Sequence, residues 1–133
     1  YNLPYHSVCT TSTHDMTPLR NWWKEDPEKT QRYYNHVLQR IGEAPDECTA
    51  EIVAQIISNH LKTRSMLTII PLQDWFAMDD SIKRKDIESE RINVPANSTH
   101  YWRYRMHITL EQLLQADNLN NKIVSLIKEA GRK

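Results

Sequence analysis

Glycine is scarce in this chain, since Gly42 and Gly131 are its only glycines among 133 residues. A loop that cradles phosphates needs several glycines close together, so the sequence excludes the common nucleotide-binding fingerprints. The charge also lacks a dominant sign, because 17 basic residues balance 17 acidic ones. This balance removes the electrostatic case for nucleic acid as a partner. No apolar run approaches the roughly 20 residues of a membrane-spanning helix, so we expect no membrane partner.

Cysteine is equally rare. Cys9 and Cys48 are too few and too far apart for a disulfide scaffold or a Cys-x-x-Cys metal knuckle, which favours reduced thiols in a cytoplasmic protein. We therefore expect no metal and no cofactor. An initiator methionine is missing, and residues 1–5 have the pattern of a lead-in to a strand. The chain is therefore expected to be cut out of a longer protein.

The first pattern with a chemical meaning spans residues 5–23. A short β-prone run leads into a hydroxyl-rich turn that presents His14 beside Asp15, and Thr17 and Pro18 then stand at the N-cap and first position of a predicted helix. In a β/α protein the loop after the carboxyl end of a strand carries catalytic groups, so His14 and Asp15 occupy an active-site position. The alternative is that Asp15 and Thr17 only cap the helix. The local pattern leaves both interpretations open.

Two more helices are predicted before the next strand. Asp26 has the position of an N-cap, and the helix after it is expected to run to about Ile41, before the stop signal of Gly42. From Thr49 to Leu61 apolar residues recur with a helical period, which predicts a helix facing the core. Within it, His60 is expected at the boundary of the core and not as a metal ligand.

A continuous apolar run, Met66–Ile70, ends at Pro71 and predicts a strand buried on both faces. Such strands belong to parallel sheets covered by helices, and the helical segment before it is what a parallel crossover requires. A brief helix or turn over 72–78 is expected to follow. Residues 79–100 are rich in charge and lack a regular period, so we predict a mobile surface loop there.

The segment Tyr101–Met106 alternates aromatic and basic residues. Two interpretations are open: its aromatic side chains cover the core, or its aromatic and arginine side chains stack on sugars or bases. Thr109 begins a capping-box helix to about Gln115. A last helix is expected from a cap at Asn118 or Asn120 to about Ala130. Its predicted buried face consists of Ile123, Val124, Leu126 and Ile127.

Four stretches of the chain together resemble motifs of the 4-alpha-glucanotransferases, the amylomaltase or disproportionating enzymes of glycoside hydrolase family 77. In chain order they are Thr13-His14-Asp15 with Leu19-Arg20-Asn21-Trp22-Trp23, then Ile70-Pro71-Leu72-Gln73-Asp74, then Arg91-Ile92-Asn93-Val94-Pro95, and then Tyr101-Trp102-Arg103-Tyr104-Arg105. They are similar to the segments after the family's seventh and eighth barrel strands, its Arg-Met-Asn-x-Pro turn and its Asn-Trp-Arg-Trp-Arg segment. Met16 and Asn21 depart from the commoner bacterial pattern, and the wording Thr11-Ser12-Thr13-His14-Asp15-Met16 is closer to the long plant-type branch.

The resemblance implies an α/β fold, namely the C-terminal portion of a (β/α)8 TIM barrel that is mostly helical with two short parallel strands. Residues 1–133 would be the last two β/α units plus C-terminal helices. The implied reaction is a retaining transfer of alpha-1,4-glucan segments between maltooligosaccharides or to glucose. The nucleophile and the acid/base lie on earlier strands in the family and are not in this sequence.

The resemblance also implies roles for individual residues. Asp15 would be the carboxylate that stabilises the transition state, and His14 its sugar-binding neighbour. Asn93 would lie near the sugar path. Gln73 and Asp74 follow the second strand, where they would contact substrate or stabilise the turn, and both interpretations are open.

A piece of a barrel leaves both edges of its sheet open. We therefore expect the isolated chain to be inactive, mostly helical and self-associated as a two-fold homodimer. Its expected partners are alpha-1,4-glucans, maltooligosaccharides and the remainder of the parent barrel. The alternative function is that of a non-catalytic helical module that binds carbohydrate or another protein.

Overall fold

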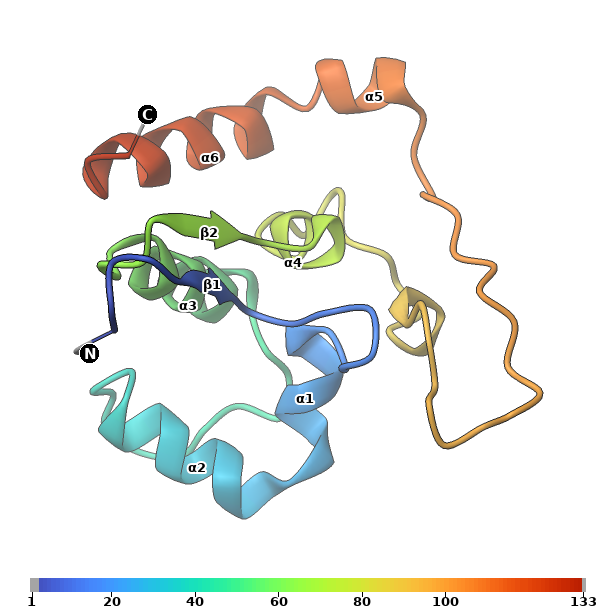
Figure 1. Cartoon of the computed structure of the whole chain (residues 1–133), viewed down its shortest axis with the longest axis horizontal. Coiled ribbons are helices and arrows are strands. Elements are labelled where there is room, and N and C mark those ends of the chain that lie inside the picture. Colours follow the sequence, from blue (N-terminus) through green and yellow to red (C-terminus); the bar gives the residue numbers. More distant parts are fainter. Residues whose placement is uncertain (1–2, 133) are drawn as a thin grey trace.

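The two predicted strands lie side by side in the computed structural model, which describes residues 3–132 (Figure 1). β1 (Val8–Thr10) and β2 (Leu67–Ile69) are parallel, with Val8 opposite Leu67. Helices connect them, so the predicted parallel crossover is confirmed. The part of the predicted lead-in at residues 1–2 lies outside the described residues.

The crossover contains three helices, which are α1 (Leu19–Glu25), α2 (Pro27–His36) and α3 (Ala50–Leu61). The cap predicted at Asp26 is confirmed, and Thr49, the predicted start of the next helix, also caps it. The Asp26 carboxylate accepts a hydrogen bond from the Lys29 amide at 3.0 Å, and the Thr49 hydroxyl accepts one from the Ile52 amide at 3.3 Å. Each cap satisfies an amide of the first helical turn that has no partner within its own helix.

The predicted end of α2 near Ile41 was wrong, because the helix ends at His36. The Asn35 side-chain amide donates to the Arg40 carbonyl at 2.8 Å and so closes a turn directly after the helix. Gln39 adopts a positive φ of 55°, which breaks the helical path. Ile41 is 98% exposed, so its place in the apolar pattern does not put it in the core.

The predicted cap of α1 was also wrong. Thr17 donates its hydroxyl to the Glu25 carboxylate at 2.7 Å, and the position before the helix belongs to Pro18, which provides no side-chain cap. The Leu19 amide instead donates to the Asp74 carboxylate at 2.9 Å. A carboxylate from a distant part of the chain thus replaces the local cap.

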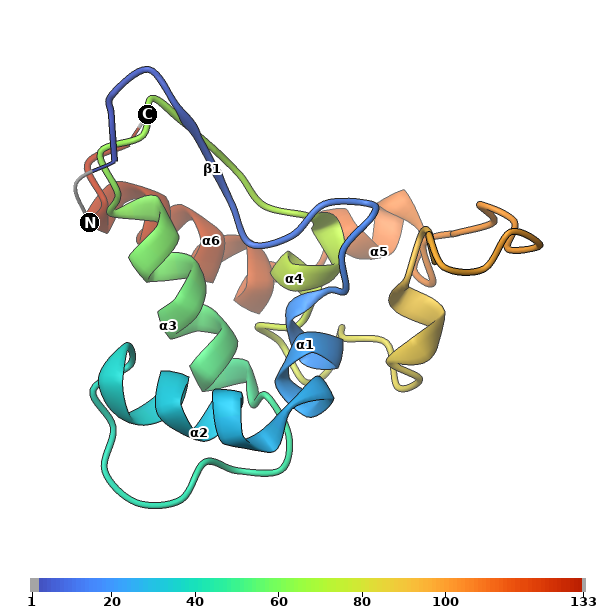
Figure 2. The ribbon, with the colours of Figure 1, turned by 60° about the horizontal axis from the view of Figure 1, so that its bottom comes forward.

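The core forms around α3, against which α6 (Asp117–Glu129) packs (Figure 2). The buried apolar residues of the described chain are Leu19, Trp23, Leu38, Cys48, Ile52, Val53, Ile56, Ile57, Leu61, Phe76, Ala77, Met78 and Leu119. α6 begins earlier than predicted, after Ala116, and Leu119 is its fully buried residue. Val124 is 48% exposed, contrary to prediction, since it follows Ile123 and so lies about 100° around the helix from the face that meets α3.

The short elements follow the predicted order. α4 (Leu72–Phe76) lies directly after β2, and α5 (Leu110–Leu114) begins with the predicted capping box between Thr109 and Gln112. The charged segment before α5 contains one 3-10 turn, Glu88–Glu90. The mobility predicted for residues 79–100 stays a prediction.

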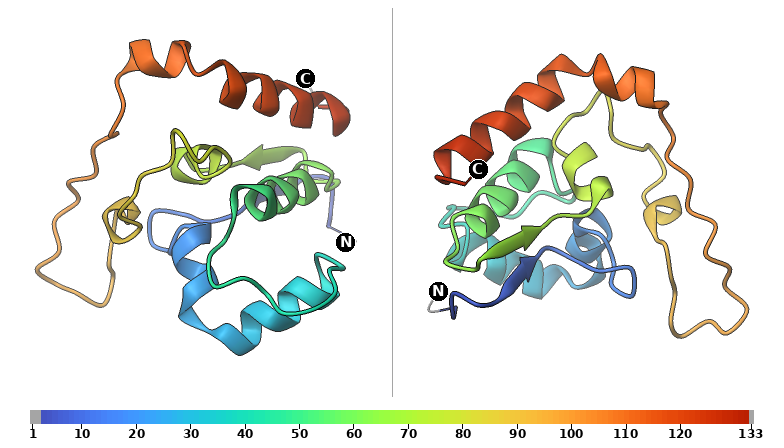
Figure 3. Two further views of the ribbon diagram at one scale, coloured as in Figure 1. Left: turned by 180° about the vertical axis from the view of Figure 1, so that it is seen from behind. Right: turned by 45° about the horizontal axis from the view of Figure 1, so that its top comes forward.

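The strand predicted to be buried on both faces is open on one of them. Leu67 and Ile69 are 47% and 58% exposed, and Val8, paired with Leu67, is 57% exposed. Alternate residues of a strand point to opposite faces, so these three share one face. Figure 3 shows α3 behind the other face of the pair. Two strands with helices on one side leave this face without a cover from the described chain.

Candidate functional site

The loop after β1 brings together three of the predicted site residues. His14 Nε2 lies 3.3 Å from Asp15 Oδ2, and Asn93 Nδ2 donates a hydrogen bond to Asp15 Oδ1 at 2.6 Å. The side chains of His14 and Asp15 are about half exposed, at 51% and 53%. Both oxygens of the Asp15 carboxylate are therefore oriented by neighbours while the group stays accessible to a ligand.

An exposed aromatic ring borders this cluster. The Trp102 ring centroid lies 4.9 Å from that of His14, with the two planes tilted by 47°, and Trp102 is 59% exposed. We did not predict Trp102 as a site residue, although the alternation of aromatic and basic residues around it was the available signal. Imidazole, carboxylate and carboxamide supply hydrogen-bond donors and acceptors, and the indole adds an apolar surface. Such a combination suits a ligand with both hydroxyls and apolar ring faces.

Asp74 fixes the loop that carries His14 and Asp15. Its carboxylate accepts hydrogen bonds from the Thr11 hydroxyl at 2.5 Å, the Ser12 hydroxyl at 3.3 Å and, as described above, the first amide of α1. Asp74 is 1% exposed, and burial raises its pKa while these hydrogen bonds oppose the rise. The contacts hold both ends of the loop, which is the turn-stabilising interpretation. Its contact with substrate stays a prediction.

Gln73, the neighbour of Asp74, is also buried, at 5% exposure. Its side-chain amide donates to the Glu90 carbonyl at 3.1 Å and so connects α4 to the segment that leads to Asn93. Substrate contact from Gln73 likewise stays a prediction.

A buried ion pair joins α1 to the same segment. Arg20 Nη1 lies 3.1 Å from Glu90 Oε1, and their side chains are 9% and 3% exposed. The same nitrogen donates to the Arg84 carbonyl at 2.7 Å. Burial raises the pKa of Glu90 to about 7, although the charge of Arg20 opposes that rise. Sequence reasoning missed this pair, because nothing local marks Arg20 and Glu90 as partners.

Other features of the described residues do not extend the site. No group of three His, Cys, Asp or Glu side chains in residues 3–132 is placed to hold a metal ion. His60 is half-buried at the edge of the core and its ring nitrogen contacts the Ile56 carbonyl at 2.8 Å.

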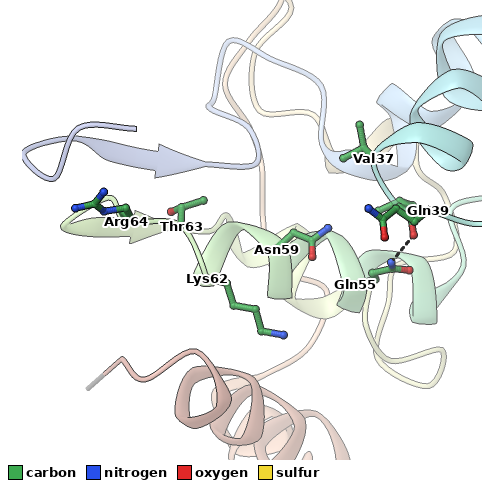
Figure 4. Close-up of a pocket in the computed structure, with 8 residues that line it drawn as sticks. Val37, Gln39, Gln55, Asn59, Lys62, Thr63 and Arg64 are labelled. Atoms are coloured by element: carbon green, nitrogen blue, oxygen red, sulfur yellow. Dashed lines mark hydrogen bonds between the residues drawn. The ribbon is translucent and has the colours of Figure 1, made fainter. Parts of the chain in front are cut away.

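A cavity of about 370 Å³ lies between the end of α2 and α3, as Figure 4 shows. Its residues 62–64 precede β2 whereas Asp15 follows β1, so the cavity lies at the opposite end of the parallel strands.

The fold matches part of a solved enzyme. The amylomaltase from Streptococcus agalactiae, solved in complex with acarbose, superposes with a TM-score of 0.72 at 18% identity, and the match covers 98% of this chain and 23% of that one. The likeness confirms the predicted fold class, an α/β barrel portion that is mostly helical with two short parallel strands.

Sequence comparison identifies the family. The family model described as 4-alpha-glucanotransferase matches residues 1–111. This chain therefore belongs to the 4-alpha-glucanotransferase family, glycoside hydrolase family 77, and the resemblance seen in its motifs is confirmed.

Individual relatives agree with this membership. The 4-alpha-glucanotransferase DPE2 of Oryza sativa subsp. japonica is 39% identical over 128 residues, which cover 96% of this chain and 14% of the rice protein. The 4-alpha-glucanotransferase of Chlamydia trachomatis is 31% identical over 123 residues, or 90% of this chain and 22% of that protein. The higher identity to the plant protein agrees with the plant-type features of the sequence. The chain spans less than a quarter of the length of these relatives.

No helix within residues 3–132 combines the length and apolar character needed to cross a membrane.

Proposed function

We propose that this chain is the C-terminal portion of the catalytic barrel of a 4-alpha-glucanotransferase. The parent enzyme would transfer alpha-1,4-glucan segments between maltooligosaccharides, or to glucose, by a retaining mechanism. The observation that carries the proposal is the arrangement of His14 and Asn93 around Asp15, on the loop that follows the carboxyl end of β1. Family membership favours this enzyme over a non-catalytic binding module.

In this proposal Asp15 stabilises the transition state. A retaining transfer passes through a distorted sugar that carries positive charge, and a fixed carboxylate beside that sugar is worth more there than in the ground state. The Asn93 amide donor holds Asp15 Oδ1 in place, and His14 presents a second polar group to the sugar hydroxyls. The nucleophile and the acid/base would come from barrel strands outside this chain.

The proposal also explains why one face of the two-stranded sheet is exposed. Val8, Leu67 and Ile69 would point into the barrel, where side chains from the other strands would cover them. The remainder of the parent barrel is thus the first partner of this chain, and alpha-1,4-glucans are its ligands. We place the parent enzyme in the cytoplasm, in keeping with the two free cysteines of this chain.

The test is Asp15→Asn in the parent enzyme. We expect kcat for maltotriose disproportionation to fall by at least about a hundredfold, because the substitution removes a charge that acts mainly in the transition state. Thermal unfolding should stay within experimental error of the unsubstituted enzyme, since Asp15 is half exposed. An unchanged kcat would remove Asp15 from the site. The isolated chain should release no glucose from maltotriose, and release by a clean preparation would contradict the proposed division of catalytic groups.

We further propose that the isolated chain forms a homodimer through the open face of its sheet. Val8, Leu67 and Ile69 expose apolar area that a second copy would cover. Light scattering should give twice the chain mass, and Leu67→Lys should shift the chain to a monomer. The matched control is Glu47→Gln, an exposed position away from the sheet, which should leave the dimer intact. A chain that stays monomeric at all concentrations would contradict the dimer.

A further inference from the structure

We propose that Arg20 and Glu90 are positioning residues that hold Asn93 against Asp15. The proposal rests on the proposed function, because it assigns to the pair an effect on the reaction in which Asp15 takes part. Neither residue touches the proposed sugar site itself.

The first step of the argument is the placement of Arg20. It follows the Asp15 loop in sequence and lies in the first turn of α1, whose N-terminal amide is bound by the Asp74 carboxylate. Its guanidinium reaches the carbonyl of Arg84 and the carboxylate of Glu90, which both belong to the segment 79–100. Arg20 therefore joins the element behind Asp15 to the segment that carries Asn93.

The second step is the fixation of that segment. The Glu90 side chain binds Arg20, and its carbonyl accepts the Gln73 amide at 3.1 Å. Beside it, the Asn21 amide donates to the Glu88 carboxylate at 3.1 Å. Three contacts from α1 and α4 thus fix the 3-10 turn, which ends three residues before Asn93, and the half-buried Asn93 donates its side-chain amide to Asp15.

The third step is that a buried ion pair adds little net stability, so stability by itself does not explain the presence of this one. Removing both charges from water cancels much of their attraction, and apolar residues of similar size often stabilise as well. A guanidinium carries several hydrogen-bond donors in a fixed plane, so it fixes the relative positions of the groups that it binds. Here Arg20 Nη1 contacts the Arg84 carbonyl and the Glu90 carboxylate at once. These two contacts fix the position of the 3-10 turn relative to α1.

The charges around Glu90 supply a second, independent readout. Arg20 on α1 and Arg84 in the loop favour its ionised form, whereas burial and the negative charge of Asp74 on α4 oppose it. The pKa of Glu90 is about 7, so below that pH it is mostly protonated and resembles glutamine. The kcat ratio of unsubstituted enzyme to Glu90→Gln should therefore be large above pH 7 and approach one below it. Because both enzymes contain the same other catalytic groups, the titration of those groups cancels when the two kcat values are compared at the same pH.

The experiment uses the parent enzyme with maltotriose. At pH 8, Glu90→Gln should lower kcat about tenfold, because a shift of about 1 Å at a catalytic group costs up to about a hundredfold, and should change KM much less. Arg20→Lys keeps the charge but loses the planar fork, and should lower kcat in the same way. Glu47→Gln breaks an exposed pair with Lys24, which lies on α1 like Arg20, and should leave kcat unchanged.

A double-mutant cycle with Asn93→Ala separates positioning from general support of the fold. If the pair acts through Asn93, the kcat effect of Glu90→Gln should largely vanish when Asn93 is already alanine. Additive effects, or a kcat ratio that does not change with pH, would overturn the proposal. If Asp15→Asn reduces kcat but Glu90→Gln and Arg20→Lys do not, the proposed function stands and the positioning role fails. If Asp15→Asn has no effect, the proposed function fails first.

Discussion

Asp15, within the loop after β1, and Asp74, which binds the two ends of that loop, show two uses of the same side chain. Asp15 is half exposed, and its carboxylate is bordered by His14 and Asn93. Asp74 is buried, and its carboxylate is occupied by two hydroxyls and a backbone amide at the ends of the loop. The exposed carboxylate remains available for chemistry, and the buried one keeps it in place.

The difference between the two aspartates shows how the position of the Asp15 side chain is fixed. A loop that carries a catalytic group has few contacts of its own, so its shape depends on groups that lie behind it. Here these groups come from α4 and from the segment before Asn93, and both are distant in sequence. Substitutions at the two aspartates should accordingly affect different properties.

The largest effect on stability is expected at Asp74. Asp74→Ala leaves two hydroxyls and the Leu19 amide without their acceptor, so unfolding free energy should fall by about 3 kcal/mol, since each buried unsatisfied group costs about 1–3 kcal/mol. Asp15→Ala should change it by less than about 0.5 kcal/mol, as exposed substitutions usually do. Urea unfolding of both variants measures the contrast. Equal losses would show that the two aspartates do not differ in this way.

Glu90 extends the comparison to a third carboxylate, which is buried like that of Asp74 but is paired with the Arg20 guanidinium. Its pKa is raised from 4.5 to about 7, so the folded chain binds this proton more tightly than the unfolded chain does. Its contribution to stability is therefore full below about pH 4.5 and is lost as the pH rises to about 7, with a loss of roughly 2.5 kcal/mol between pH 5 and pH 8. Urea unfolding at pH 5 and pH 8 should show this loss in the unsubstituted chain and not in Glu90→Gln. The same pH dependence in both would assign it to other groups.

The smallest effect is expected for the exposed ion pair that joins Lys24 of α1 to Glu47 in the loop before α3. Lys24 Nζ and the Glu47 carboxylate are 3.3 Å apart, with side chains 44% and 69% exposed. Water screens such pairs, so Lys24→Met should lower the unfolding free energy by less than about 0.5 kcal/mol. Thermal unfolding at low and high salt provides the measurement. A larger loss that disappears at high salt would mean that this pair contributes more than its exposure predicts.

Local patterns predicted a large part of the fold correctly. The Asp26 cap, the helix start near Thr49 and the Thr109 capping box formed as expected, because each cap needs only the amide three positions ahead. The parallel pairing followed from two short apolar runs separated by helices. The end of α2 and the start of α1 were wrong, since both depend on hydrogen bonds outside the helical pattern.

The sequence by itself determined which family this chain belongs to, where most of its helices lie, and that His14 and Asp15 occupy the loop after a strand. Only the tertiary structure decided that Asn93 contacts Asp15, and that Asp74 and the Arg20–Glu90 pair support them. It also decided that Val8, Leu67 and Ile69 are exposed on one face of the sheet. The physical reason is range: caps and periodicity act within a few residues, whereas these contacts and faces depend on which distant segments pack together.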